Sequence, residues 1–129
     1  MKIHHIGYLV TSIASATEAF KNLGFTILQK PLYDADRNIL ISFISNDGYV
    51  VELIEPDQNC ELFKYTQKKI GNAPFHICYI SKNFEAEIED LQRKGYFLLT
   101  SPAPAKALAG KKIVFLMSAD IGLIEIVSE

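Results

Sequence analysis

The chain has 129 residues, of which 49% are hydrophobic and 22% charged, an ordinary composition for one globular domain with its own core. The formal net charge of −2 and the lack of a long basic run exclude the electrostatic footprint of a nucleic-acid-binding protein. No apolar run approaches the roughly 18 residues of a membrane span, and the first residues do not resemble a signal peptide. We therefore expect a cytoplasmic protein with neither a nucleic-acid nor a membrane partner.

The first half of the chain predicts a strand, a helix and three further strands. Residues 2–10 alternate in polarity as a strand does, because successive side chains point to opposite faces. A helix should follow, capped by Thr11 or Ser12 and ended by Gly24. Strands are expected over residues 25–32, 38–45 and 49–54, the last two joined by a hairpin turn at Asn46-Asp47-Gly48. The helical stripe expected to face the core comprises Ile13, Ala16, Ala19, Phe20 and Leu23.

The second half predicts the same order of elements. Residues 57–73 form a polar link in which we expect a helix from Glu61 to Ile70. The elements after the link are a strand at 75–81, a helix at 83–94 that ends at Gly95, and strands at 96–100, 112–118 and 123–128. Residues 101–110 contain too much proline for regular structure, so an irregular segment that borders a site is expected there.

The two halves also repeat one set of chemical groups. His76 follows His5 by 71 positions, and Glu125 follows Glu52 by 73. A repeat of this length is too long for a solenoid period and is typical of two halves that complete each other's core. The sequence thus predicts an α+β fold in which two βαβββ modules form a curved mixed sheet around a central cavity. We expect one domain over residues 1–129, with modules at 1–56 and 74–129 and the link at 57–73.

The repeated histidines and glutamates predict a metal site. Glu52 and Glu125 interrupt apolar strands, where a charged carboxylate is costly unless it is paired or bound to a metal. If the modules enclose a common cavity, His5, His76 and both carboxylates can converge on it. Two imidazoles and two carboxylates suit a divalent ion such as Zn, Ni, Co or Mn and leave positions open for water or substrate.

Two neighbouring residues are expected not to bind that metal. His4 has no histidine counterpart in the second half, where Phe75 takes its place, so we interpret it as a strand histidine with a structural role. Cys78 shares a strand face with His76, but its counterpart is Gly7, so a small residue that packs beneath a cavity explains both positions.

Four segments carry a resemblance to a known family: His5-Ile6-Gly7 with Val10, Val51 to Pro56, Phe75 to Cys78, and Leu123 to Ile126. Over essentially its whole length the chain resembles the vicinal-oxygen-chelate, or glyoxalase-like, superfamily. It looks most like the methylmalonyl-CoA epimerase and lactoylglutathione lyase branch. The resemblance implies a divalent metal bound by His5, Glu52, His76 and Glu125, and it implies a homodimer.

The resemblance also implies proton transfer next to a carbonyl. The branch with a carboxylate in both halves is redox-neutral, and its substrates are small thioesters or hemithioacetals of CoA or glutathione. An acyl-CoA epimerase requires a second base, which alignment back from Glu52 places at Asp36, with Asp34 beside it. A lactoylglutathione lyase, the alternative, would use Glu125 to shuttle the proton. A metal-free binding or resistance protein is a further alternative, because the superfamily includes such members.

Overall fold

The structure, a computed structural model, describes residues 1–129 as an α+β fold with three α-helices and nine strands. The chain divides into two compact units, residues 5–75 and residues 1–4 with 76–129. The elements of the amino-terminal half are β1 (Lys2–Leu9), α1 (Ile13–Lys21), β2 (Thr26–Asp34), β3 (Ile39–Asn46), β4 (Tyr49–Pro56) and α2 (Glu61–Ile70). Those of the carboxy-terminal half are β5 (Ala73–Ser81), α3 (Phe84–Arg93), β6 (Phe97–Leu98), β7 (Ala103–Ala105), β8 (Lys111–Ser118) and β9 (Gly122–Ser128).

In the unit of residues 5–75 the strands follow the order β2-β3-β4-β1. β1 and β4 are parallel, whereas β2, β3 and β4 form antiparallel pairs, so the sheet is mixed, as expected. The predicted hairpin is confirmed. Asn46 pairs with Tyr49, and Asp47 and Gly48 between them have φ values of 50° and 80°, the left-handed geometry of a two-residue turn that matches strand twist.

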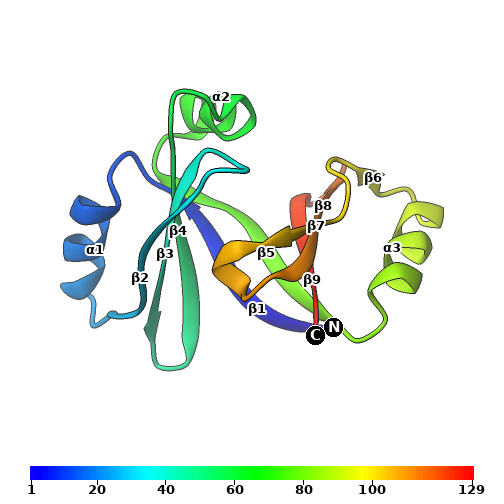
Figure 1. Cartoon of the computed structure of the whole chain (residues 1–129), viewed down its shortest axis with the longest axis horizontal. Helices are drawn as coiled ribbons and strands as arrows, with labels where there is room; N and C mark the ends of the chain where they lie inside the picture. Colours follow the sequence, from blue (N-terminus) through cyan, green and yellow to red (C-terminus); the bar gives the residue numbers. More distant parts are fainter. The chain divides into compact units, whose positions relative to one another are not determined.

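Helix α1 covers one face of this sheet (Figure 1). Ser12 caps it by accepting a hydrogen bond from the backbone N–H of Ser15 at 3.2 Å, as the sequence predicts. The expected inward stripe is wrong at two positions, because Ala19 and Leu23 are exposed and Thr17 is buried in their place. The core between helix and sheet consists of Val10, Ile13, Ile44, Val51 and Leu53, with Tyr8, Ala16, Phe20, Phe25 and Leu40 around them.

The link between the halves is helical, and α2 has the predicted bounds. The ring of Phe63 packs edge-on against Phe75, with centroids 5.3 Å apart. The carboxylate of Asp57 accepts a hydrogen bond from the Tyr33 hydroxyl at 2.6 Å and one from the Asn59 backbone at 2.7 Å. Residues 57–73 therefore pack as part of the unit of residues 5–75.

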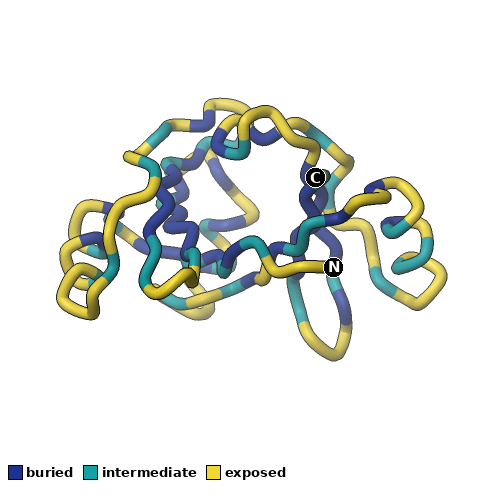
Figure 2. The backbone as a smooth tube through the Cα atoms, turned by 90° about the horizontal axis from the view of Figure 1, so that it is seen from below, coloured by how far each residue is buried: buried dark blue, intermediate teal, exposed yellow.

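The second unit repeats this plan around α3. Its strand order is β5-β9-β8-β6, with β5 and β9 parallel and β8 antiparallel to β9. Helix α3 lies beside the strands of this unit (Figure 1). Its residues Phe84 and Ile88 pack against the sheet. Figure 2 shows buried positions concentrated in strands and exposed positions on the outer turns of α1 and α3. The buried core of this unit comprises Phe84, Ile88, Val114, Leu116, Ile124 and Ile126.

The segment after α3 differs from its prediction. Regular strand structure at residues 96–100 is limited to Phe97–Leu98, although the Leu99 and Thr100 N–H groups still donate to the Phe115 carbonyl. The segment 101–110, expected to be irregular, forms strand β7, which pairs with Lys111–Ile113, and a short 3-10 turn at Lys106–Leu108. A proline is tolerated in β7 because an edge strand has one row of N–H groups that the sheet does not use. None of the three α-helices is long and apolar enough to cross a lipid bilayer.

Candidate functional site

The first unit brings His5 and Glu52 together on neighbouring parallel strands. Gly7 of β1 lies opposite Glu52 of β4, and His5 lies two residues earlier on the same face of β1. The His5 Nε2 atom is 3.5 Å from the Glu52 Oε1 atom. The two residues are only 1% and 5% exposed, so the pair faces away from solvent.

The second unit builds the same pair in the same register. Cys78 of β5 lies opposite Glu125 of β9, and His76 lies two residues before Cys78. The His76 Nε2 atom is 3.1 Å from the Glu125 Oε2 atom, and the residues are 4% and 2% exposed. The sequence repeat is thus expressed as two equivalent His–Glu pairs, one in each unit.

A phenylalanine that the sequence pattern did not single out accompanies each pair. Phe43 lies opposite Glu52 on β3, and its ring packs edge-on against His5 with centroids 5.4 Å apart. Phe115 lies opposite Glu125 on β8 and packs in the same way against His76 at 5.3 Å. Edge-on contacts of this kind favour one orientation of each imidazole. The register of each hairpin could have identified these phenylalanines in the sequence, because each is the cross-strand partner of a glutamate.

The geometry of each pair suits two ligands of one metal ion. Two donor atoms that each lie about 2.1 Å from an ion are about 3.0 Å apart at an octahedral angle and about 3.4 Å apart at a tetrahedral angle. The distances of 3.5 Å and 3.1 Å lie close to these values. Imidazole and carboxylate donors suit first-row divalent ions, so the residues present fit the expected group.

His4 and Cys78 are the two residues that the sequence predicts not to bind the metal. His4 is half-buried and Cys78 fully buried, and their possible ligand atoms lie within 4.8 Å of each other. Cys78 nevertheless occupies the position that Gly7 occupies in the first unit, opposite the glutamate. That equivalence agrees with a packing role for a small residue beside the carboxylate. The expectation that neither residue binds metal stays a prediction.

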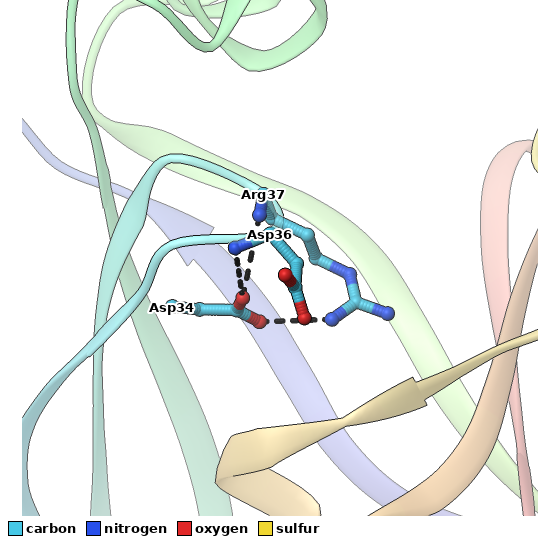
Figure 3. A network of polar contacts seen from close by, with 3 residues as sticks. All are labelled: Asp34, Asp36 and Arg37. Carbon is cyan, nitrogen blue, oxygen red and sulfur yellow. Dashed lines mark hydrogen bonds and ion pairs between the residues drawn. The ribbon is translucent and has the colours of Figure 1, made fainter.

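The expected second base lies at the connection of β2 and β3. Asp36 is exposed there, whereas Asp34 is only 2% exposed. The Asp34 carboxylate accepts hydrogen bonds from the backbone N–H groups of Asp36 and Arg37, at 3.0 and 3.3 Å, and from Arg37 Nη1 at 2.8 Å (Figure 3). The Asp34 carboxylate therefore bonds within the turn. Of the two aspartates, Asp36 is the one that is exposed and can reach a ligand.

Comparison with known proteins finds relatives over most of the chain. Residues 4–115 match the profile of the Glyoxalase/Bleomycin resistance protein/Dioxygenase superfamily. The chain is 23% identical over 122 residues to the mitochondrial methylmalonyl-CoA epimerase of Homo sapiens, an alignment that covers 94% of this chain and 69% of the human protein.

Solved structures share the fold. A hypothetical protein of Bacillus halodurans C-125 matches with a TM-score of 0.86 and 26% identity, covering 99% of this chain and 94% of the other. A variant of the Streptomyces coelicolor methylmalonyl-CoA epimerase in complex with 2-nitronate-propionyl-CoA matches with a TM-score of 0.82 and 22% identity, covering 100% of this chain and 94% of that one.

Proposed function

Because the chain belongs to the Glyoxalase/Bleomycin resistance protein/Dioxygenase superfamily, we propose that it is a metal-dependent enzyme that transfers a proton next to a carbonyl, with epimerisation of an acyl-CoA of the methylmalonyl type as its reaction. The observation that carries the proposal is the duplicated buried His–Glu pair. A protein that only sequesters a small molecule has no need for two buried carboxylates, whose desolvation is costly. The similarity to methylmalonyl-CoA epimerases supports the choice of substrate class.

In this proposal His5, Glu52, His76 and Glu125 together hold one divalent ion, which is Zn, Ni, Co or Mn. When bound, the ion supplies Lewis acidity that polarises the thioester carbonyl and lowers the cost of removing the neighbouring proton. Phe43 and Phe115 keep the imidazoles oriented through their edge-on contacts. A dry, rigid surround strengthens every electrostatic interaction at such a centre.

Epimerisation needs proton-transfer groups on both faces of the reacting carbon. We assign Asp36 as the base on one face and Glu125 as the carboxylate that serves the other. One group removes the α-proton from its face, and the other returns a proton to the opposite face, which inverts the configuration. The exposed carboxylate of Asp36 is available for this task, in contrast to the buried Asp34.

A second candidate is a lactoylglutathione-lyase-like reaction on a glutathione hemithioacetal. The short side chain of Asp36 favours this candidate, because Glu125 alone would then shuttle the proton between neighbouring carbons. In either reaction we propose that the enzyme is a symmetric homodimer, the common form of closed oligomers.

Turnover of defined substrates separates the candidates. Metal-loaded protein is given one stereoisomer of methylmalonyl-CoA in one assay and a glutathione hemithioacetal in another. The proposal predicts inversion of the thioester and negligible turnover of the hemithioacetal. The reverse result would replace it with the lyase. Absence of both activities, together with absence of bound metal, would favour a metal-free binding protein.

A further inference from the structure

The connection of β2 and β3 is held more firmly than a turn requires. The Asp34 side chain accepts the N–H groups of Asp36 and Arg37, and its backbone carbonyl also accepts the Arg37 N–H at 3.3 Å (Figure 3). Asn38 then adopts a left-handed φ of 57° and leads into β3. This pattern is an aspartate-initiated turn, in which a side-chain oxygen takes the place of a backbone acceptor.

The turn itself does not require the ion pair between Asp34 and Arg37. An asparagine at position 34 would offer the same side-chain oxygen to both backbone N–H groups. Instead the chain buries a carboxylate to 2% exposure and pairs it at 2.8 Å with a guanidinium whose side chain is 21% exposed. A buried ion pair seldom raises stability over a neutral alternative, and its best-attested use is to fix one geometry. The geometry fixed here is that of the segment carrying Asp36.

We infer that Asp34 and Arg37 are positioning residues for Asp36, an inference that rests on the proposed function of Asp36 as a base. An aspartate has two side-chain torsions, so the place of its carboxylate follows closely from the place of its backbone. The N–H of Asp36 is itself bound by Asp34. A displacement of about 1 Å in a reacting group can lower the rate about 100-fold. A rigid backbone at Asp36 would therefore keep the reaction fast.

The pair also explains why arginine follows the base. Arg37 bonds to Asp34 through its backbone N–H and its guanidinium, so a single residue closes the turn at two points. Lysine would keep the charge but lack the planar fork that fixes direction. We therefore expect Arg37→Lys to rescue only part of the activity that Arg37→Gln loses.

The test follows α-proton exchange in D₂O from each stereoisomer of methylmalonyl-CoA separately. Asp34→Asn keeps the turn acceptor and removes the charge that Arg37 binds. It should slow exchange from the isomer that depends on Asp36 by about 10- to 100-fold and leave exchange from the other isomer within about twofold. In the Asp36→Asn background, Asp34→Asn should cause no further loss, because residues that act as one unit are not additive.

Asp57→Asn is the matched control. Asp57 also closes a turn with its carboxylate, through the Asn59 N–H, and has a side-chain partner in Tyr33, but it does not hold Asp36. Exchange from both isomers should therefore stay within about twofold of the wild-type rate.

The outcomes are distinguishable. Equal slowing of both isomers by Asp34→Asn, or a further loss in the double variant, would overturn the positioning role while the base stands. If Asp36→Asn itself leaves exchange from both isomers unchanged, the base assignment fails and the inference fails with it. Should Asp34→Asn not fold, Arg37→Gln removes the same ion pair from the other side and is held to the same criteria.

Discussion

Replacement of His76 by alanine should remove the metal from the protein. The Nε2 atom of His76 lies 3.1 Å from Glu125, and both residues are almost fully buried. An alanine side chain has no atom that can bind a metal. The variant therefore removes one of the four proposed metal ligands completely.

The size of the effect follows from the direct role proposed for the imidazole. Outer partners that only orient a metal ligand typically contribute 10- to 100-fold in affinity, so removal of a direct ligand should cost at least about 100-fold in metal Kd. That factor corresponds to about 2.8 kcal/mol of binding free energy. His5→Ala should have an effect of the same size, because His5 occupies the equivalent place beside Glu52 in the first unit.

The assay is competition for the metal with a chelator of known affinity, supported by elemental analysis of the purified variants. His4→Ala is the control, since His4 adjoins His5 in sequence and has a possible ligand atom close to Cys78. Its metal Kd should stay within about threefold of the wild type, a change of less than about 1 kcal/mol. Equal reductions in metal affinity in His4→Ala and His76→Ala would refute the ligand assignment.

Three further predictions concern stability and assembly. Ser12→Ala should lower the free energy of unfolding by about 0.5–2 kcal/mol, because it removes the cap that accepts the Ser15 N–H; urea denaturation measures this, and an unchanged midpoint would contradict it. Hydrogen bonds from Tyr33 and the Asn59 backbone lower the pKa of Asp57, so its stabilising contribution is present above the ordinary aspartate pKa and is lost as pH falls through the lowered value. Asp57→Asn should therefore flatten the acid side of the stability profile, and an identical profile would count against this cause. Light scattering at micromolar concentration should give the mass of a homodimer, and a monomer alone would disprove that proposal.

Much of the fold was predictable from the sequence because local signals and tertiary packing agree. The Asn46-Asp47-Gly48 turn fixes a hairpin register by backbone geometry alone, and α2 has the expected bounds. The stripe of α1 was less predictable, because the angle at which a helix meets its sheet decides whether Ala19 or Thr17 faces inward. Strand β7 was missed because proline weakens a strand in isolation, whereas an edge position next to β8 accommodates it.

In the candidate site, the residues that the sequence repeat contains were predictable. His5 and Glu52, and likewise His76 and Glu125, are brought together within their units by parallel strand pairs in matching register. Phe43 and Phe115 carry no charge and resemble any core aromatic, so only cross-strand register identifies them. The sequence alone did not predict that the Asp34 carboxylate bonds within the turn and Asp36 does not. This difference depends on the direction of the Arg37 side chain.

Proton NMR of methylmalonyl-CoA in D₂O measures directly whether the protein catalyses metal-dependent proton transfer next to a thioester carbonyl. The chelated protein is titrated with Co or Zn while the α-proton signal is followed. We expect exchange to be negligible without metal, to rise in proportion to added metal and to reach its plateau at about one ion per chain. Exchange at the same rate in chelated and reconstituted protein, or no exchange with the metal fully bound, would contradict it.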